Sequence, residues 1–553
     1  MTEARTRWLC AISAFVLVLL SCWRIAATYD EFWQTWDEPF HLACGLEWWE
    51  RGTYTYERFH PPLARICIAF LPYMAGLKGD PSAENHWIEG NELLHSGGSY
   101  ERNLALARLG VLPFFVIASV VVFLWAMRCG GAFAGLCAVG LFVLLPPVLA
   151  HAGMAALDMA NAAMVAAALY AFQCWCDKPG LIRGGIFGTT AGLAVMTKFS
   201  AVPFLAAGLM FMLVLRRSSP GTERAAQRWI PSAAAAFAAA ALVIWGGYRF
   251  SLESIQPVGN GLDALLEKAG PMAVPIKDIV RRAPVPAGGF FWGLYDLLVF
   301  RRSDGHLAFF LGEVSKHGWW LFYPVLLLLK TPLPFLVLVG GALFTEGRQW
   351  WRRHRGTELS APMACAFGVL VAAAVATPNN GLRQALAVYP LLAVVAGCAF
   401  AGLWRSAASS VLRACLAVIL LVWSVAVPVM AHPDYLSYFN PLAGADPSKI
   451  VVNSDLDWGQ DLKRLKAVCE RREIAALTLK YNGSKDIDLS RFGLPVLTEL
   501  EPGQRPSGWV ALSLNDLRRG SGDPPYDQYA WLGDVEPVET AGHSIRVYFF
   551  PSQ

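Results

Sequence analysis

The sequence predicts an α-helical membrane protein that crosses the bilayer many times and ends in a small α/β domain. Of its 553 residues, 55% are hydrophobic and only 16% are charged, whereas about a quarter of the residues of a soluble chain are charged. The apolar residues gather in runs near the roughly 20 residues that a helix needs to cross the hydrocarbon core. The last stretch, from about residue 432, is polar and mixed instead.

The apolar runs predict about eleven crossings. The stretch 185–215 is too long for one helix, and we expect it to break at Lys198-Phe199-Ser200. The first run follows Arg5 and Arg7 as in a signal peptide, but its apolar core is long and no small-residue cleavage site follows, so we expect a retained helix. The predicted spans are 9–28, 104–126, 132–150, 156–176, 185–198, 202–215, 230–248, 319–345, 361–377, 383–404 and 410–430.

The Lys and Arg residues of the short loops predict the orientation, because basic loops stay on the cytoplasmic side. Alternate loops are basic, whereas the short loops 151–155 and 378–382 hold no Lys or Arg. This pattern places the N-terminus in the cytoplasm and a C-terminal domain, 432–553, outside. The membrane domain, 1–431, then carries two long outer loops, 29–103 and 249–318. The basic inner loops hold Arg128, Lys178, Arg183, Arg216, Arg217, Arg224, Arg228, Arg348, Arg352, Arg353, Arg355 and Arg405.

The C-terminal stretch has the alternating patterns of a small α/β domain. We expect strands at 449–454, 474–481, 508–514 and 544–550, and an amphipathic helix at 457–472. Most of the twelve cysteines lie in apolar runs, where a thiol is a small hydrophobic group. Cys44 and Cys67 fall in one outer loop, but nothing demands a disulfide between them. The net charge of +4 gives no indication of a nucleic-acid partner.

The first outer loop opens with Trp36-Asp37-Glu38-Pro39-Phe40-His41. Two adjacent carboxylates beside a membrane helix are costly unless they face water or a polar cavity. One interpretation is a solvated helix start, with Asp37 as the cap and Pro39 in the first turn. The other is a polar site, because Asp37 and His41 are four residues apart and share one helix face.

A second motif, His60-Pro61-Pro62-Leu63-Ala64-Arg65, follows about twenty residues later. With Asp37-Glu38 and Gly52-Thr53-Tyr54 before it, this order resembles the first outer loop of membrane glycosyltransferases of the C-type fold. The group includes the protein O-mannosyltransferases and the bacterial aminoarabinose transferases (glycosyltransferase family 39). The resemblance covers the membrane portion, about three quarters of the chain. Its further motifs are Ala150-His151-Ala152 with Asp158, Leu193–Phe199, Lys330–Pro334, Gly381-Leu382-Arg383 and Tyr389-Pro390.

The resemblance implies inverting transfer of a monosaccharide from a polyprenyl-phosphate donor to an acceptor hydroxyl on the outer face of a bacterial plasma (inner) membrane. It implies Asp37 as the general base, with Glu38 positioning the acceptor or sharing that role. The second outer loop is too short for the β-trefoil insert of the eukaryotic mannosyltransferases. His60 also replaces the Lys of the aminoarabinose transferases. The acceptor, whether protein, lipid or glycan, therefore stays open.

A lipid-phosphate leaving group gains negative charge as the glycosidic bond breaks, and fixed cations stabilise that charge. Lys198 and Arg383 lie near predicted outer helix ends, where snorkelling to the membrane surface is the alternative. Lys330 lies well inside a predicted span, so either it faces a polar cavity or the true crossing begins near Thr331. The candidate phosphate ligands are His60, Arg65, Lys198, Lys330 and Arg383.

His151 and Asp158 form another polar pair at an outer helix end. With Asp37 or His41 they have the ligand types that suit Mg, Mn or Zn, but their spacing follows no specific ligand pattern. A divalent metal therefore stays open, its ligands unknown, and no cofactor is required. Asp455-Leu456-Asp457 could be mistaken for the metal-binding pair of nucleotide-sugar transferases, but the tail is small for that fold and lies on the side that lacks nucleotide sugars. We expect a strand-to-helix turn there, with Asp457 as a cap.

Three alternatives to a monosaccharide transferase remain. A lipid or solute transporter would use the intramembrane polar groups as a pathway, although no paired internal repeat of the transporter kind is evident. A non-catalytic membrane assembly protein would keep the fold and bind a partner through its tail. An oligosaccharide ligase would keep the enzyme and change the chemistry. In each case membrane lipids surround the helices.

Overall fold

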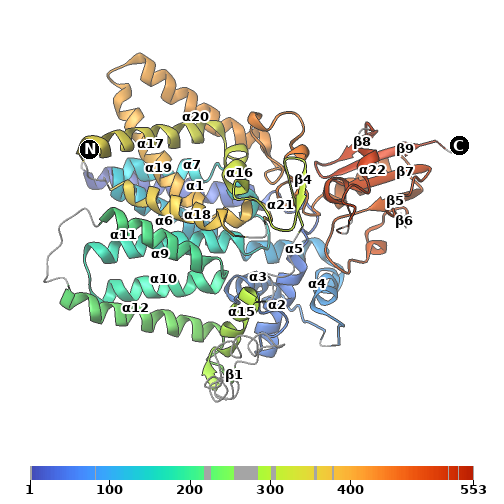
Figure 1. Cartoon of the computed structure of the whole chain (residues 1–553), viewed down its shortest axis with the longest axis horizontal. Helices are drawn as coiled ribbons and strands as arrows, with labels where there is room; N and C mark the ends of the chain where they lie inside the picture. The colour runs from blue at the N-terminus through green and yellow to red at the C-terminus, as the bar shows by residue number, and fades with distance from the viewer. Residues whose placement is uncertain are drawn as a thin grey trace.

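The computed structural model describes residues 3–80, 82–216, 226–254, 284–299, 307–353, 358–376, 379–520, 522, 524–533 and 535–551. Parts of two predicted basic loops, 217–225 with Arg217 and Arg224 and 354–357 with Arg355, lie outside the described residues, as do 255–283 and 300–306 of the second predicted outer loop. The chain forms a bundle of roughly parallel and antiparallel helices, with a mixed α/β part against one end of it (Figure 1).

Within the described residues, six helices are long and apolar enough to cross a membrane. They coincide with six of the predicted spans, which confirms a multi-pass membrane protein. The second of them is a continuous span made of α5 and α6. The helices are α1 (Glu3–Ala26), α5 (Tyr100–Leu109) with α6 (Leu112–Gly130), α9 (Asp158–Asp177), α12 (Ala226–Gly247), α19 (Val388–Ala407) and α20 (Val411–Ala431).

Two further predicted spans are pairs of helices with a sharp bend between them. The bend is 71° between α7 (Ala132–Phe142) and α8 (Pro146–Ala152), and 119° between α16 (Phe322–Lys330) and α17 (Leu333–Arg353). Prolines follow both breaks, and a proline cannot continue the preceding helix because it lacks the N–H. The remaining three predicted spans are shorter apolar helices. These are α10 (Leu181–Thr197), α11 (Ala201–Arg216) and α18 (Ser360–Ala374).

The break between α10 and α11 falls at Lys198–Ser200, as predicted. Helix α10 packs closely on α12 through glycines. A Cβ atom added at Gly188 would lie 1.9 Å from the carbonyl oxygen of Ala236, and one at Gly184 would lie 2.2 Å from that of Ser232. Small residues four apart allow helices to approach in this way in membranes. This contact fixes α10, whose end carries Lys198.

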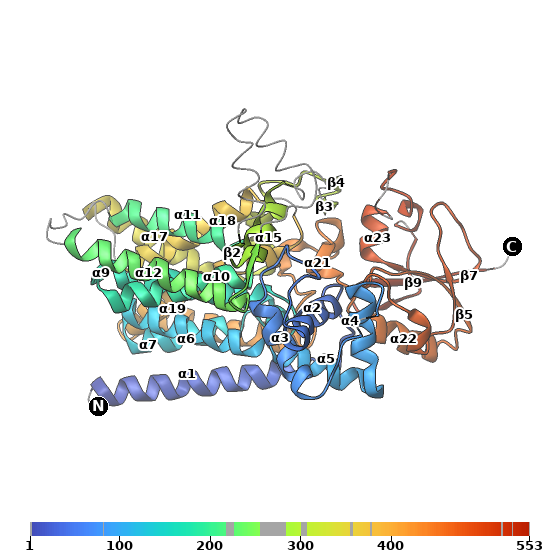
Figure 2. The same cartoon turned by 90° about the horizontal axis from the view of Figure 1, so that it is seen from below.

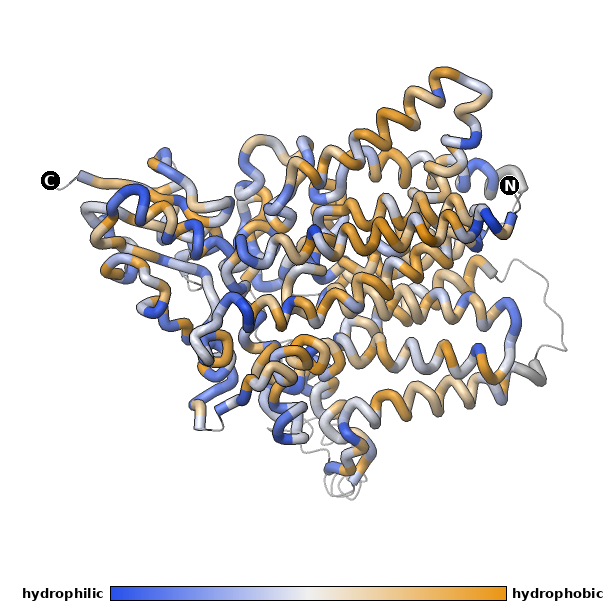
Figure 3. Tube along the Cα trace, turned by 180° about the vertical axis from the view of Figure 1, so that it is seen from behind, coloured by the Kyte–Doolittle hydropathy of each residue, from blue (hydrophilic) through white to orange (hydrophobic). Residues whose placement is uncertain are grey.

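The helices of the bundle are mostly hydrophobic along their length, whereas hydrophilic and hydrophobic residues alternate in the α/β part (Figure 3). Large hydrophobic side chains such as Trp8, Phe237 and Val411 are more than two-thirds exposed on the bundle. Exposed apolar surface of this extent is what contact with lipid requires, since a soluble protein rarely leaves such patches uncovered.

The first predicted outer loop is a compact helical segment at the end of the bundle nearest the sheet. Cys44 and Cys67 are both free thiols in it. Its elements are α2 (Glu38–Leu46), η1 (Glu47–Arg51), α3 (Leu63–Met74), α4 (His86–His95) and η2 (Ser96–Gly98). The described parts of the second predicted loop are β1 (Leu252–Ser254) paired with β2 (Pro284–Pro286), α15 (Gly288–Val299), and β3 (Ala308–Phe310) paired with β4 (Glu313–Ser315).

The C-terminal part contains a five-stranded sheet in the order β6-β5-β7-β9-β8. Strand β5 pairs in parallel with β6 and with β7, and β9 pairs antiparallel with β7 and β8. Three of the predicted strands correspond to β5, β7 and β9. The strands are β5 (Ala476–Lys480), β6 (Val496–Glu499), β7 (Gly508–Ser513), β8 (Glu539–Ala541) and β9 (Ile545–Phe550), with α22 (Leu462–Arg471) and α23 (Leu514–Arg519) beside them.

Two details of the C-terminal prediction are wrong. Residues 449–454 form no ladder strand; the chain passes from η6 (Pro447–Lys449) into α21 (Asn453–Leu456), with one isolated bridge from Val451 to Phe310. The apolar Val451 and Val452 are fully buried, so tertiary packing rather than strand pairing uses their side chains. Helix α22 starts at Leu462, and its N-cap position is Asp461, so Asp457 does not cap this helix.

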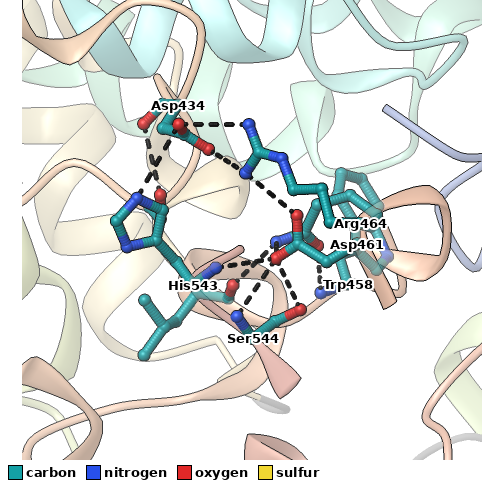
Figure 4. A network of polar contacts seen from close by, with 9 residues as sticks. Asp434, Trp458, Asp461, Arg464, His543 and Ser544 are labelled. Carbon is teal, nitrogen blue, oxygen red and sulfur yellow. Dashed lines mark hydrogen bonds and ion pairs between the residues drawn. The ribbon is translucent and has the colours of Figure 1, made fainter. Parts of the chain in front are cut away.

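A polar network ties the sheet to the end of the last membrane helix (Figure 4). Arg464 of α22 donates to Asp434, just after α20, at 2.5 Å, and to Asp461 at 3.2 Å. Asp461 also accepts the backbone N–H groups of His543 at 3.0 Å and Ser544 at 3.1 Å. The C-terminal part is therefore joined to the end of α20 by a partly buried, charge-assisted hydrogen bond, which is stronger than a neutral one.

Candidate active site

A cavity of about 690 Å³ lies where the bundle, the first loop and the C-terminal part meet. The elements around it, α2, α15 and α21, lie together at the end of the bundle nearest the sheet, also when the molecule is turned by 90° (Figure 2). Its lining includes Trp36, Asp37, Phe40, His41, Glu57, Arg58, His60, Trp87, Asp158, Lys198, Trp292, Asp296, Arg383, Asp457, Trp458, Asn482, Asn515 and Arg519.

Asp37 occupies the N-cap position of α2, but its side chain makes no capping hydrogen bond. It accepts a hydrogen bond from Arg383 instead, with Nη1 2.7 Å from Oδ2. The Asp37 side chain is 21% exposed, and it lines the cavity together with His41. The capping interpretation is therefore wrong for this carboxylate, and the shared helix face of Asp37 and His41 does border a polar cavity.

Lys198 and Arg383 share the buried carboxylate of Asp158. Lys198 Nζ lies 2.7 Å from Oδ1, and Arg383 Nη1 lies 3.6 Å from Oδ2. The Asp158 side chain is only 2% exposed. Arg383 also lies 4.3 Å above the ring of Trp458, a favourable cation–π geometry. Both cations are thus fixed at the cavity wall by protein partners, which excludes snorkelling to the membrane surface.

Two of the histidines that line the cavity, His41 and His60, favour the uncharged form. Burial and the nearby Arg65 guanidinium lower the pKa of His41 well below its usual value. Burial likewise lowers the pKa of His60, against the opposing effect of Glu57, whose carboxylate lies 3.0 Å from Nδ1. His60 can therefore offer a phosphate a hydrogen bond, but not a positive charge.

Arg65 stands behind the cavity wall and is fully buried. It donates to Tyr54 Oη at 2.7 Å, to His41 Nδ1 at 3.2 Å and to the Glu57 carboxylate. These bonds hold the loop that presents Glu57 and Arg58 to the cavity. Both of those lining residues were missed by the sequence prediction, although they lie directly between the Gly-Thr-Tyr and His-Pro-Pro motifs.

Glu38 also lies outside the cavity lining and is 1% exposed. Its two oxygens accept from Arg108 at 2.8 and 2.9 Å and from the backbone N–H groups of Thr35 at 2.7 Å and Ala155 at 2.8 Å. These bonds fix the start of α2 and hence Asp37. Arg108 could have been found from the sequence, because a cation inside a predicted span needs a partner.

Lys330 and His151 do not line the cavity but lie close behind it. Lys330 ends α16 at the 119° bend, so the helix does break before Thr331. Its Nζ donates to the carbonyl oxygens of Leu436 at 2.6 Å and Asp455 at 2.5 Å. His151 lies 6.0 Å from the Trp458 ring. Both residues therefore support the wall that the C-terminal part adds to the cavity.

A metal site is not formed by these side chains. Among the residues that the structure describes, no three His, Cys, Asp or Glu side chains are grouped so as to hold a metal ion. Asp158, whose side chain is 2% exposed, pairs with Lys198 and Arg383. Asp37 and Asp158 thus balance protein cations instead.

Fold and site together define a multi-pass membrane protein with a charged cavity between its helix bundle and a C-terminal α/β part. No protein-family model matches the sequence, and no curated protein matches it. Among solved structures, the chain is similar to apo ArnT from Cupriavidus metallidurans, with 13% identity over 98% of both chains and a TM-score of 0.49. The same ArnT bound to undecaprenyl phosphate matches with 14% identity over 96% of this chain and 97% of that one, and a TM-score of 0.47.

The chain is also similar to the apo oligosaccharyltransferase of Archaeoglobus fulgidus, with 14% identity and a TM-score of 0.48. That match covers 79% of this chain and 56% of the other, so the chain spans little more than half the length of the oligosaccharyltransferase. Aminoarabinose transferases such as ArnT are one of the groups whose motifs this sequence resembles.

Proposed function

We propose that this protein is an inverting glycosyltransferase that moves a monosaccharide from a polyprenyl-phosphate donor to an acceptor hydroxyl. One observation carries the proposal: a carboxylate, Asp37, and two fixed cations, Lys198 and Arg383, line a single cavity at the ends of membrane helices. The reaction takes place at the outer face of a plasma (inner) membrane, with the N-terminus in the cytoplasm and the C-terminal part outside.

Donor binding exchanges the partners of Arg383. Without donor, the positive charges of Arg383 and Lys198 are balanced by Asp37 and Asp158. Asp37 is the more exposed of the two carboxylates, at 21% against 2% for Asp158, so an incoming phosphate displaces Asp37 more readily. The lipid phosphate then lies on Arg383 and Lys198, and the Asp37 carboxylate becomes available to the acceptor.

The transfer is a single displacement. The acceptor oxygen forms a bond to the anomeric carbon as its proton passes to Asp37, a general-base step worth about 10²- to 10⁴-fold in rate. The bond from the anomeric carbon to the phosphate oxygen breaks, and the phosphate leaves with the electron pair. Arg383 and Lys198 stabilise the charge that develops on it. The products are the glycosylated acceptor, with inverted configuration, and the polyprenyl phosphate.

The test is sugar release or transfer from synthetic polyprenyl-phosphate sugars by the purified protein, with Asp37→Asn as the decisive variant. We expect it to lose about 10²- to 10⁴-fold in rate while still folding. Asp30→Asn is the matched control, because Asp30 is an exposed aspartate outside the cavity lining, and we expect it to retain activity. A donor panel that gives neither turnover nor binding would overturn the proposal.

A lipid or solute transporter is the second candidate. It is favoured by the two bent helix pairs, since broken helices frame the binding sites of many transporters. A transporter would move its cargo across proteoliposomes without breaking the bond between sugar and phosphate. Flux of unchanged lipid, unaffected by Asp37→Asn, would therefore favour this candidate.

A further inference from the structure

One wall of the cavity belongs to the C-terminal part. Asn482 follows β5, Asn515 follows β7, and both residues line the cavity. Strands β5 and β7 are parallel neighbours, so their carboxyl ends meet at the same edge of the sheet. Open α/β sheets bind ligands just beyond the carboxyl ends of such strands. In this protein that edge faces the cavity that holds Asp37 and Arg383.

The turn at 457–460 completes this wall and is joined to the chain that leads into Asp37. Trp33 N–H donates to the carbonyl oxygen of Gln460, and Trp36 N–H donates to that of Trp458, both at 2.9 Å. The Trp458 ring also contacts Arg383, whose Cζ lies 4.3 Å from the ring centroid. The wall therefore has a fixed position relative to the candidate base and to one candidate phosphate ligand.

The wall offers hydrogen-bonding groups that are not all used within the protein. The side-chain amide of Asn515 donates to the carbonyl oxygen of Asp457 at 2.7 Å and accepts the N–H of Asn453 at 2.8 Å, so it holds the turn. In the described part of the chain, no hydrogen bond involves the side-chain amide of Asn482. That amide, with two donors and an acceptor oxygen, is available to a ligand.

Asp457 adds a second polar group to this wall of the cavity. The carboxyl group is 1% exposed; Oδ2 accepts the N–H of Asn515 at 2.9 Å, and Oδ1 accepts that of Gly459 at 3.3 Å. Burial raises the pKa of Asp457 to about 8, so at neutral pH the group carries a proton. A protonated carboxyl both donates and accepts hydrogen bonds, as a sugar hydroxyl requires of its partner.

Aromatic rings from the first loop line the same cavity. Phe40 and Trp87 stack with their ring centroids 4.7 Å apart, and Trp36 meets Trp87 edge-on at 6.4 Å. A site with apolar ring faces and a few directed polar groups is typical of small-molecule pockets. This combination matches a sugar ring, which has apolar C–H faces and a rim of hydroxyl groups.

We propose that this wall binds the hydroxyl groups of the sugar carried by the donor, with Asn482 and Asp457 as specificity-determining contacts. Arg383 lies 4.3 Å above the Trp458 ring, and Asp457 and Asn482 line the same cavity. A sugar bonded to a phosphate on Arg383 can therefore reach this wall. This inference rests on the proposed function and adds a role for the C-terminal part.

The test measures the extra affinity that the sugar provides. Binding of undecaprenyl phosphate and of a panel of undecaprenyl-phosphate sugars is compared for the full-length protein in detergent. We expect the wild type to bind at least one of the sugar-bearing lipids more tightly than the bare lipid phosphate. Asn482→Ala should reduce that difference by about 2- to 10-fold, as for one neutral hydrogen bond, and leave the affinity for bare undecaprenyl phosphate unchanged.

Gln504→Ala is the matched control, because Gln504 is an exposed amide of the same part of the chain, outside the cavity lining. It should change neither affinity. The sugar subsite would be overturned if the wild type bound all the lipids with equal affinity. It would also be overturned if Asn482→Ala left every affinity unchanged or lowered all of them by the same factor. Either result would leave lipid-phosphate binding standing. A wild type that binds none of these lipids would overturn the proposed function itself, and the subsite with it.

Discussion

The guanidinium of Arg383 binds the carboxylate of Asp37 across 346 residues of sequence, with Nη1 2.7 Å from Oδ2. This ion pair joins the first loop to the segment before α19. In the proposed function, one partner is the general base and the other holds the leaving phosphate. The two residues would thus act as one unit, each held by the other until the donor arrives.

The coupling between Asp37 and Arg383 should be measurable in a double-mutant cycle. We expect Asp37→Asn and Arg383→Gln each to lower kcat/KM strongly, because loss of either group removes the same charge arrangement. The double variant should lose far less than the product of the two single losses, as for other catalytic groups that depend on each other. Steady-state kinetics on a sugar-phosphate lipid provide the measurement. Strictly multiplicative losses would show that the two residues act independently.

The Asp158–Lys198 pair should matter for folding as well as for the donor. Removing one partner leaves a buried charge, which costs about 3–5 kcal/mol. We therefore expect Asp158→Asn and Lys198→Met each to lower the Tm of the purified protein clearly. The double variant Asp158→Asn with Lys198→Met should be less destabilised than the sum, since neither charge is then left alone.

A matched control for that pair lies on the sheet. Lys480 Nζ lies 2.6 Å from Glu499 Oε1, but the Glu499 side chain is 63% exposed. Exposed pairs of this kind contribute about 0–1 kcal/mol, so Glu499→Gln should hardly change the Tm. An Asp158→Asn variant as mild as Glu499→Gln would show that the Asp158 site is better solvated than its burial indicates.

The helices could be predicted from the sequence because lipid imposes a minimum length on apolar runs. All eleven predicted spans contain a helix or a bent pair of helices, and even the break at Lys198–Ser200 was found. The candidate site was only half predictable. Asp37, Lys198 and Arg383 stand in short motifs that resemble those of a known group, and these residues do line the cavity.

The other half of the site depends on contacts between distant segments, which no local pattern encodes. Glu38 is next to Asp37 in sequence, but its carboxylate binds Arg108, 70 residues away, and lies outside the cavity lining. Lys330 was expected near the phosphate, yet the C-terminal part supplies its partners. Asn482 is an ordinary residue after a strand, and only the docking of the sheet on the bundle brings it to the cavity.

Asp455 should be a positioning residue for Arg383. Its carboxylate accepts the backbone N–H of Leu382 at 3.0 and 3.1 Å and lies 3.6 Å from Lys330 Nζ. We expect Asp455→Asn to raise the KM for the donor more than it lowers kcat, because the turn that carries Arg383 loses one of its anchors, whereas Glu38 still fixes the start of α2 and hence Asp37. Hydrogen exchange should also quicken at 380–385. A variant that lowers kcat alone, with unchanged exchange, would contradict this role.

The buried carboxyl of Asp457 should make stability depend on pH in a way that its amide analogue does not. The pKa is 3.8 when the group is free and about 8 in the folded protein. Between these values the folded state holds a proton that the unfolded state lacks. The stability that this proton provides is therefore fully present below about pH 4 and lost as the pH rises through about 8.

Asp457→Asn cannot ionise, so the difference in Tm between this variant and the wild type should grow in the variant's favour from pH 6 to pH 9. The sugar-dependent part of donor affinity should fall above pH 8 in the wild type, because an ionised Asp457 can no longer donate a hydrogen bond, and it should stay level in the variant. Asp527→Asn is the control, since Asp527 is exposed and lies outside the cavity lining. Parallel pH profiles for Asp457→Asn and the wild type, in both Tm and affinity, would show that Asp457 is already ionised at neutral pH.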